Sequence, residues 1–539
     1  MKSQCLPFIQ IPHTTRLFAD FLSWTPPIQP FYARSPHFSE WLKDETPSLR
    51  YDSARREKVT AILERQNKAW SASPKTLENI ARLRAGASVV VTGQQVGLFG
   101  GPLFSIFKAL TAIKLADQAS AAGVNCVPVF WLATEDHDLA EVNHISVPGP
   151  DGSLQNLVAP TQGLLDAPVG TITFGAEIGP VAEAAAGFLG DYEAAGLLRD
   201  CYRPGETLGS AFARLCTRLF ADWGVILLDA SDAELHAIVE PIYRAAIERA
   251  AELDDALLAR GKELEAARYH QQVKVTPSST LLFMLQDGAR VPVHRRANAG
   301  STPDFVIGEE RVPEPELLRH ITSAPHHFSA NVLLRPVVQD YLLPTLAYTG
   351  GAAEVAYFAQ AGVVYQALLG RMTPIVPRFS ATIVEAKPQA LLERYGLGLP
   401  DLFHGTESLR ETLAKRTLPQ ELQSAFDQAD AALKKSVIAI GESLARLDKT
   451  LVEAASNAGS KMHYQLDQLR SRAARAELRQ SEVLGRHAEL LSNALYPNKT
   501  LQEREIAGSY FVARHGAELL RSLYDNIHTD CLDHQVIVL

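Results

Sequence analysis

The stretch VVVTGQQVGLFGGPLFSIFKALTAIKLA, residues 89–116, joins a short apolar run to a glycine-rich turn and then to a helical pattern. Residues 87–91 are largely β-branched, which is typical of a buried strand. Apolar side chains then recur at helical spacing over residues 103–113, and Gly123 follows as a stop signal. Residues 125–134 have the pattern of another buried strand. The stretch therefore predicts a βαβ unit, and with it a parallel sheet covered by helices.

The same alternation returns further along the chain. Residues 225–229 and 342–351 predict strands followed by helices, and residues 373–385 predict extended structure. We expect the following division of the α/β chain: parts of the core at 1–149, 205–265 and 331–395, connecting insertions at 150–204 and 266–330, a linker at 396–419, helical coiled-coil arms at 420–495, and a C-terminal segment packing back on the core at 496–539.

Residues 420–495 carry a heptad pattern. Apolar residues recur at alternating steps of four and three, which is typical of a coiled-coil seam, at Leu433, Val437, Ile440, Leu444, Leu447, Leu451, Ala454 and Ala458. SNAGS, residues 456–460, interrupts the pattern and predicts a turn between two antiparallel arms. An arm of ~35 residues would extend about 50 Å. We expect a protruding hairpin that forms a homodimer, because its outer positions are largely charged; a core helix pair is the alternative.

Composition limits the kinds of partner. The chain has 539 residues, of which 46% are hydrophobic and 21% charged, as in a globular protein of two or three structural units. Its formal charge of −9 gives no basic surface for nucleic acid. No apolar run approaches the ~20 residues that span a bilayer, and no secretory signal precedes the first strand. The five cysteines are scattered without a CxxC pair, which argues against a disulfide framework and favours a cytoplasmic protein.

The turn GQQVGLFGG, residues 93–101, lies between the first predicted strand and helix. Such a turn can bring backbone N–H groups to an anion, and Gln94 and Gln95 add side-chain amides. The P-loop pattern fails because no GK[ST] closes the turn, and GxGxxG is absent. A turn whose glycines serve only tight packing is the alternative. We expect a ligand site, because paired glutamines at the end of a strand are unusual for packing.

The second predicted strand ends in TEDHDLAEVNH, residues 134–144. Its polar groups fall at the carboxyl edge, where open α/β sheets bind ligands. We expect His137 to act in general acid–base catalysis, or the carboxylates to bind an amine. A zinc or manganese site is a second reading, but no HExxH frame appears, so no tight metal is expected. The third interpretation is a solvated acidic loop with no binding role.

Two further stretches carry polar residues at turns. In RPVVQDYLLPTLAYTGGAAEVAYF, residues 335–358, a strand ends in a glycine turn before a helix. Arg335 would clamp a carboxylate there, or it forms a structural salt bridge. YPNKTLQERE, residues 496–505, predicts a polar turn that holds a phosphate or is an ordinary surface turn.

Together these stretches resemble one family. TGQQVGLFGGPLFSIFKA, PVFWLATEDHDLAEVNHI, NVLLRPVVQDYLLPTLAYTGGAAEVAYFAQ, PIVPRFS and LYPNKTLQER are similar to the BshC family of bacillithiol biosynthesis, and the similarity covers nearly the whole chain. The resemblance implies a Rossmann-like, nucleotidyltransferase-type parallel-sheet core, related to class I aminoacyl-tRNA synthetases. It also implies two connecting insertions and an antiparallel helical coiled-coil domain that forms the dimer.

The resemblance also implies a reaction, in which a ligase joins L-cysteine to the amine of glucosaminyl-malate. By analogy with the synthetases, ATP would adenylate cysteine. Their HIGH and KMSKS signatures are absent here, so GQQVG would stand in the place of HIGH. Ala352 stands where the family more often has proline, which removes no chemical group. The alternatives are a nucleotidyltransferase-like enzyme acting on another amine or carboxylate, and a non-catalytic dimeric scaffold of the pathway.

Roles follow for individual residues on this resemblance. The catalytic set is His137 as base with Asp136 and Asp138. The residues expected to bind substrate are Gln94, Gln95, Gly97, Lys108, Glu135, His144, Arg335, Gln339, Gly350, Gly351 and Glu354. Those expected to bind a nucleotide are Arg378, Ser380, Lys499, Gln502, Glu503 and Arg504. Within these sets, Arg335 and Gln339 would orient a malyl carboxylate, and Glu354 a sugar hydroxyl.

Overall fold

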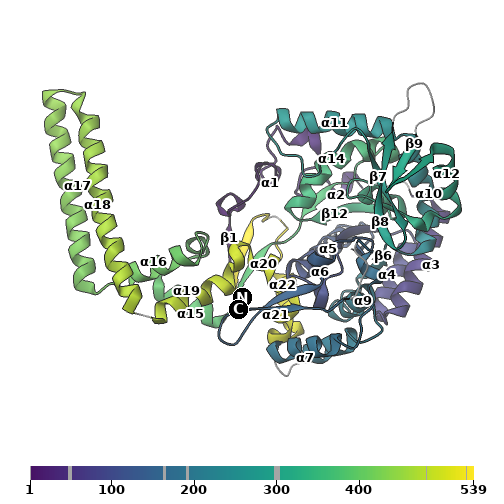
Figure 1. The fold of residues 1–539 in the computed structure, drawn as a ribbon, viewed down its shortest axis with the longest axis horizontal. Coiled ribbons are helices and arrows are strands. Elements are labelled where there is room, and N and C mark those ends of the chain that lie inside the picture. The colour runs from purple at the N-terminus through teal and green to yellow at the C-terminus, as the bar shows by residue number, and fades with distance from the viewer. Residues whose placement is uncertain are drawn as a thin grey trace.

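A central sheet of five parallel strands organises the computed structural model (Figure 1). The structure describes residues 2–45, 51–161, 166–189, 193–296, 304–480, 482–529 and 531–539. The strand order is β13 (Ile375–Pro377), β12 (Thr345–Gly350), β2 (Ser88–Gln94), β3 (Cys126–Leu132) and β6 (Ile226–Asp229). β3 and β12 are buried along their whole length, as parallel strands covered on both faces are. The predicted parallel sheet is confirmed.

Alternate residues of the strands point to opposite faces, and helices cover each face. Val89, Val91 and Val129 pack with α3 (Ser53–Ala69) and α10 (Ala233–Glu248) in one apolar cluster. On the other face, Phe130 and Leu132 pack with α5 (Phe104–Ala121) and α9 (Leu208–Leu219). α5 joins β2 to β3, so the predicted βαβ unit is present.

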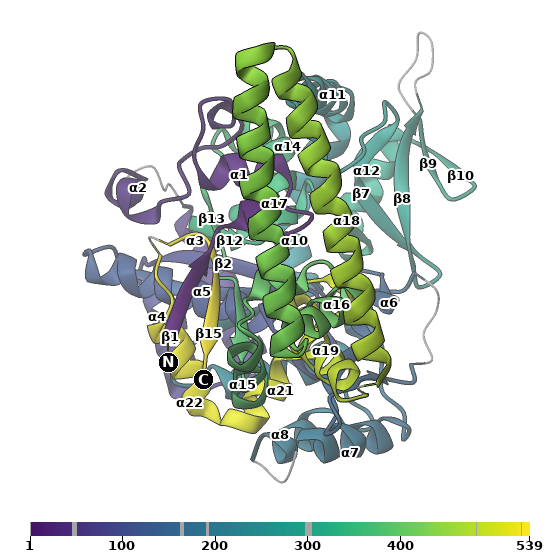
Figure 2. The same cartoon turned by 90° about the vertical axis from the view of Figure 1, so that its left-hand side faces the viewer.

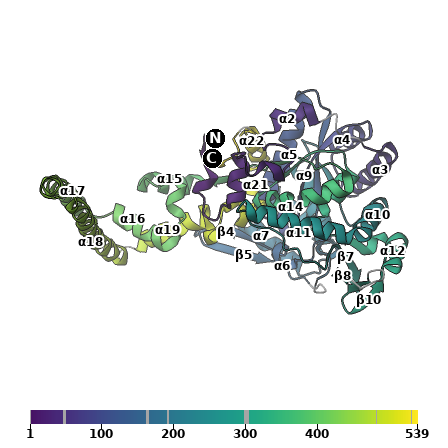
Figure 3. The ribbon, with the colours of Figure 1, turned by 90° about the horizontal axis from the view of Figure 1, so that it is seen from above.

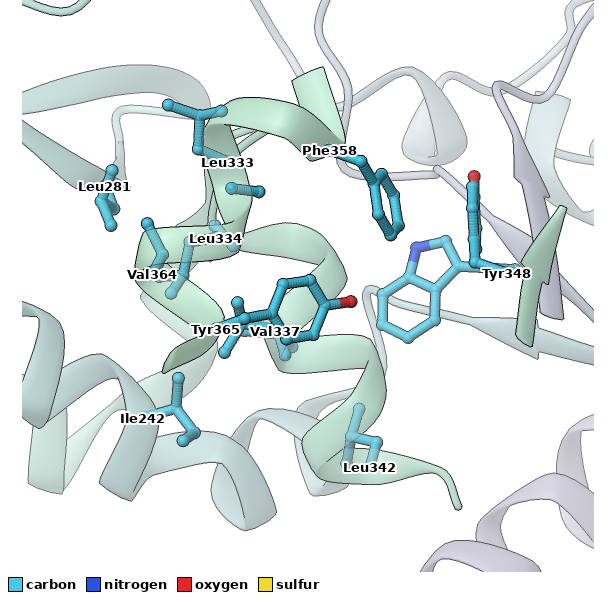
Figure 4. Close-up of a cluster of buried hydrophobic side chains, with 14 of the residues drawn as sticks. Ile242, Leu281, Leu333, Leu334, Val337, Leu342, Tyr348, Phe358, Val364 and Tyr365 are labelled. Carbon is cyan, nitrogen blue, oxygen red and sulfur yellow. The ribbon is translucent and has the colours of Figure 1, made fainter. Parts of the chain in front are cut away.

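One part of the core supports the end of β12. Figure 4 shows Tyr348 facing Phe358, and the two rings are stacked with centroids 5.0 Å apart. Phe358 belongs to α14 (Ala352–Leu369), and Leu334 and Val337, at α13 (Arg335–Leu342), complete this wall. The polar edge of the sheet therefore rests on a close-packed aromatic and aliphatic layer.

The two irregular segments have structure of their own. The second folds into an antiparallel sheet with the order β10 (Glu310–Pro313), β9 (Asp304–Ile307), β8 (Ala289–Arg296), β7 (Ser279–Gln286) and β11 (Phe328–Ala330). The first contains β5 (Leu154–Val158), which pairs with β4 (His144–Pro148), and the helices α7 (Ile178–Leu189) and α8 (Glu193–Cys201). Both contact the loop that follows β3: the Val169 N–H of the first donates to the Asp136 carbonyl, and Arg290 of the second lies against His137.

A three-stranded sheet brings the two ends of the chain together. β15 (His534–Val538) lies between β1 (Lys2–Leu6), to which it is antiparallel, and β14 (Ala381–Val384), to which it is parallel. The N- and C-termini lie side by side in Figures 1, 2 and 3. The other helices are α1 (Arg16–Leu22), α2 (Phe38–Glu45), α4 (Pro74–Arg84), α6 (Leu139–Val142), α11 (Ala250–Ala266), α12 (Glu314–Ser323), α15 (Ala386–Tyr395), α16 (Thr406–Arg416), α19 (Glu482–Leu495), α20 (Gln502–Glu505), α21 (Gly508–His515) and α22 (Ala517–Asp525).

The predicted arms are present as an antiparallel pair that projects from the body (Figure 1). They are α17 (Gln420–Leu447) and α18 (Leu451–Gln480), so each is shorter than the predicted 35 residues. The predicted turn at residues 456–460 is wrong, because these residues lie within α18. The chain turns at residues 448–450, where the Asp448 carboxylate accepts hydrogen bonds from the backbone N–H and hydroxyl of Thr450.

Gly459 has a packing role instead. A Cβ atom at Gly459 would lie 2.7 Å from a methyl group of Val437 on the facing helix, so only glycine allows this approach. Val437 and Leu444 face the seam and are half-buried. Ile440 and Leu447, which the heptad pattern also assigned to the seam, are 52% and 78% exposed. The pattern therefore combined an internal seam with an outward apolar stripe.

Candidate active site

A cavity of about 770 Å³ opens at the carboxyl ends of β2, β3 and β12. Its lining includes these residues named from the sequence: Gln94, Gln95, Lys108, Asp136, His137, Arg335, Gly351, Glu354, Arg378 and Arg504. The structure thus brings three loops, far apart in sequence, to one side of the sheet. The others named from the sequence are not in the lining: Gly97, Glu135, Asp138, His144, Gln339, Gly350, Ser380, Lys499, Gln502 and Glu503.

A buried ion pair lies at the base of the cavity. Lys108 Nζ is 2.7 Å from Glu354 Oε2 and donates hydrogen bonds to the Gly93 carbonyl and the Gln94 side chain, each at 2.8 Å. Burial lowers the pKa of Lys108 to about 8, although Glu354 opposes the change. All three ammonium protons have acceptors, so Lys108 positions Gln94 and Glu354 and has no proton left for a ligand.

Glu354 collects the donors around it. Its carboxylate accepts hydrogen bonds from the Tyr348 hydroxyl at 2.5 Å and from the Gly351 N–H at 2.7 Å. Burial would raise the pKa of Glu354, but Lys108 and these donors together hold it below its usual value. Glu354 therefore places its own carboxylate at the start of α14. A Cβ atom at Gly350 would lie 2.8 Å from Glu354 Cβ, so that glycine makes room for this side chain.

Arg335 is held beside this pair by polar aromatic residues. Its guanidinium donates to the Tyr357 hydroxyl at 2.8 Å and to the Gln339 side chain at 3.2 Å, and stands 5.5 Å from the centre of the Tyr348 ring. Burial alone would lower the pKa of Arg335, but Tyr357, Tyr348 and Glu354 together raise it above its usual value. Gln339 is fully buried and orients Arg335 from behind.

The loop after β3 presents two of its polar residues to the cavity. Arg290, from β8 of the second insertion, lies 3.3 Å from His137 Nδ1 and 3.7 Å from Asp136 Oδ1. Arg290 itself donates to the Ser329 hydroxyl and the Ala330 carbonyl. Burial raises the pKa of Asp136, and Arg290 and Arg335 oppose that rise. The insertion therefore supplies the cation that faces this acid and imidazole.

Three other polar residues of this stretch, Glu135, Asp138 and His144, are outside the lining, whereas Glu141 of α6 is part of it. Glu135 Oε1 is 3.2 Å from Nε2 of His236, a buried residue of α10, behind the cavity. Burial opposes protonation of His236, but Glu135 raises its pKa. Asp138 and His144 are exposed.

Only the first half of the opening turn faces the cavity. The N–H groups of Gly97, Gly100 and Gly101 donate to carbonyls within the turn, so they form no anion cradle. A Cβ atom at Gly97 would lie 2.9 Å from the Gly101 Cα atom. Gln95, in contrast, lines the cavity and donates to Glu141 at 2.9 Å. The glycines thus serve packing, whereas the glutamines face the open space.

A second, smaller cavity of about 300 Å³ adjoins the first. Gly351, Arg378 and Arg504 line both, and the smaller one also includes Ser380, Lys499 and Glu503. Glu503 is buried and bound by Arg378 at 2.6 Å, the Ser380 hydroxyl at 3.0 Å and the Ala381 N–H at 3.0 Å. Burial opposes ionisation, but Arg378 holds the pKa of Glu503 below its usual value.

Gln502 and Arg504 do not take part in the contacts of Glu503. Gln502 is bonded to the backbone of a strand, and Arg504 is exposed. The Gln502 side chain pairs with the backbone N–H and C=O of Ile383 in β14, which is a structural position. Arg504 is exposed, and within the described part of the chain its guanidinium has no hydrogen bond or ion pair. It stands between the two cavities as a charged donor open to a ligand.

Sequence reasoning missed several residues of the lining. Trp131 is part of β3, Tyr348 of β12, Tyr357 of α14, and Phe283 and Arg290 of the second insertion. The aromatic residues fit a buried strand or helix pattern, so nothing in the sequence marked them as cavity residues. Arg290 lies 153 residues from His137, and only the fold joins them.

No group of three or more His, Cys, Asp or Glu side chains is placed to hold a metal ion among the residues that the structure describes. Within the same residues, no helix has the length and apolar character needed to cross a bilayer.

The fold and site define a Rossmann-like α/β protein with a polar cavity at the sheet edge and a helical coiled-coil domain. Two family models match the chain: the BshC N-terminal Rossmann-like domain over residues 1–379 and the BshC C-terminal coiled-coil domain over residues 381–539. The chain belongs to the BshC family of bacillithiol biosynthesis.

Relatives that carry the name "Putative cysteine ligase BshC" align with nearly the whole chain. The one from Koribacter versatilis is 49% identical over the full length of both chains, and the one from Solibacter usitatus is 37% identical, again over both full lengths. The relative from Salinibacter ruber is 34% identical over 90% of this chain and 89% of its own.

Proposed function

We propose that the protein is an amide-forming ligase that joins L-cysteine to the amine of glucosaminyl-malate, which gives bacillithiol. The observation that carries this proposal is the full-length relationship to proteins named as cysteine ligases, together with a cavity that combines acids and cations. A substrate amine requires a carboxylate or a base nearby, and the malyl carboxylates require cations.

The contacts support separate roles around the cavity. Asp136 and Glu141 receive the amine, and His137, held by Arg290, takes its proton. Arg335 and Arg504 bind the carboxylates, since both are cations in the lining. Lys108, Glu354 and Gln339 position these groups and do not touch substrate. Of the two aspartates expected in the catalytic set, this proposal keeps Asp136 and omits Asp138, because Asp138 is outside the lining.

The second cavity supports a nucleotide site. ATP would supply the activation that an amide bond requires, and its phosphates would reach Arg504 and Arg378 where the two cavities adjoin. Lys499 also lines the smaller cavity. Glu503 and Gln502 maintain its wall by holding Arg378 and β14.

The arms support a homodimer. Apolar residues recur at steps of seven and eleven, which return to one face of a helix, at Ile440 and Leu447 on α17 and at Leu451, Met462 and Leu469 on α18. All five are exposed in the single chain. A second copy of the chain would bury them.

The reaction can be tested with the purified protein. We expect the protein, L-cysteine, glucosaminyl-malate and ATP to give bacillithiol, detected by mass spectrometry after thiol labelling. Analysis of the nucleotide products distinguishes release of AMP, as in adenylation, from release of ADP. Formation of an amide from another acid or amine but not from these two would instead favour a different substrate pair.

A further inference from the structure

Two cysteines at opposite ends of the chain lie in contact. Cys5 Sγ and Cys531 Sγ are 2.7 Å apart, although 526 positions separate the residues in sequence. The antiparallel pairing of β1 with β15 brings them together, and the Phe8 N–H donates to Asp533 close by. Figure 3 shows the two termini side by side.

The pair is reachable from solvent, unlike the other thiols. Cys5 is exposed and Cys531 is half-buried, whereas Cys126, Cys201 and Cys216 are buried. Burial, and then the hydrogen bond with Cys5, raise the pKa of Cys531 to about 11. A small oxidant therefore meets Cys5 first, and Cys531 is placed to complete the reaction.

We propose that Cys5 and Cys531 are a reversible disulfide site, oxidised by the disulfide of a low-molecular-weight thiol. The Cys5 thiolate attacks one sulfur of the small disulfide, forms a mixed disulfide and releases one small thiol. Cys531 then loses its proton, attacks Cys5 Sγ and releases the second small thiol. Two electrons pass from the protein thiols to the small disulfide, and both protons end on the released thiols.

The bond would act on the second cavity. The segment that follows Cys5 supplies Phe8, His13 and Phe18 to the wall of that cavity. On the other strand, His534 binds the hydroxyls of Ser380 and Thr382. Oxidation therefore fixes the strand that leads into this wall. The thiol chemistry does not depend on the proposed ligase activity.

The test uses the reduced full-length protein with cystine as the oxidant. We expect two of the five cysteines to lose reactivity with an alkylating reagent that is added in denaturant, where buried thiols also react, and the intact mass to fall by two hydrogens. A cross-linked peptide should contain Cys5 and Cys531, and dithiothreitol should reverse the change. The oxidised protein should also have a higher Tm than the reduced one, because the bond closes nearly the whole chain into a loop.

Variants separate this pair from chance oxidation. Cys531→Ser should stop at the mixed disulfide on Cys5, with an added half-cystine, and should lose the redox dependence of Tm. The matched variant Cys201→Ser, at a buried thiol, should still form the bond. Five alkylated thiols after cystine treatment of the wild type, or a mixed disulfide that persists there, would overturn the proposal.

Discussion

At the base of the cavity, the Lys108–Glu354 pair places opposite charges where little water reaches them. Their side chains are 5% and 15% exposed. Removing one partner of a buried pair leaves an uncompensated charge, at a cost of about 3–5 kcal/mol. We expect Lys108→Met to lower the free energy of unfolding by about 3 kcal/mol, measured by denaturant titration.

Two controls make that prediction specific. Lys114→Met changes a half-buried lysine of the same helix and should cost about 1 kcal/mol or less. The double variant Lys108→Met with Glu354→Gln should recover part of the loss, because no unpaired charge then remains. Equal stability of Lys108→Met and Lys114→Met would contradict the role assigned to the pair.

Arg504 gives a prediction about ligand binding. Its guanidinium has no protein partner among the described residues, so its removal should leave the fold intact. One lost charge-assisted hydrogen bond is worth about 1.5–3 kcal/mol, or about 10- to 100-fold in affinity. We expect Arg504→Ala to raise KM for an anionic substrate by about that factor, with Arg472→Ala on the exposed arm as control. Unchanged KM values for both glucosaminyl-malate and ATP would remove Arg504 from the site.

At this scale the sequence indicated where the chemistry lies but not which partners the side chains choose. The strand ends were predictable from β-branched runs followed by glycine, and parallel strands bring their carboxyl ends together. The pairing of Glu135 with His236 was not predictable, because Glu135 and Asp136 are adjacent acids and the sequence made either one equally suitable for binding an amine. Only the direction of each side chain on the folded loop separates them.

At the scale of elements, the small sheet of β1, β15 and β14 contains a buried titrating group. Burial lowers the pKa of His534 to about 4, from an unfolded value of 6.5. Between these values the unfolded chain binds more protons, so the free energy of unfolding falls as pH falls, by about 3 kcal/mol in all. We expect His534→Gln to flatten this acid limb in denaturant titrations between pH 7 and 4.

The matched control is His270→Gln, at an exposed histidine in the connection between α11 and β7. That variant should keep the wild-type slope of stability against pH. An identical slope in His534→Gln and the wild type would show that another group governs the acid limb.

The arms show what a heptad pattern can and cannot resolve. It predicted two antiparallel helices, because apolar residues three and four apart form one face. It did not locate the turn, since glycine within SNAGS looks like a helix stop but serves close packing against Val437. Asp448 and Thr450, which make the turn, lie between Leu447 and Leu451, whose spacing of four continues the apolar repeat across the turn and hides it.

Whole-molecule assembly depends on the outward stripe of the arms. We expect the wild type to sediment as a dimer and the double variant Ile440→Glu, Leu447→Glu to sediment as a monomer, because charges would replace buried apolar contacts. Circular dichroism should show that the helices remain. Lys435→Ala with Glu442→Ala, on the opposite side of α17, should stay dimeric. A monomeric wild type at micromolar concentration would contradict the proposed interface.

The whole fold was largely predictable because its strands, helices and arms have strong local patterns. The contribution of the second insertion was not, since Arg290 reaches His137 only after the sheet β10–β11 packs over the core. The contact of Cys5 with Cys531 was equally hidden, because it depends on both ends of the chain meeting in one sheet.

The proposed function depends most on Asp136, the acid of the loop after β3, taking part in cysteine ligation in this cavity. The most direct test is the thiol content of bacterial cells that lack the gene and carry either Asp136→Asn or Asp138→Asn. The two positions lie in one loop, but only Asp136 lines the cavity. We predict that the wild type and Asp138→Asn restore bacillithiol, whereas Asp136→Asn leaves glucosaminyl-malate accumulated. Full restoration by Asp136→Asn at equal protein level would contradict the claim and favour a scaffold.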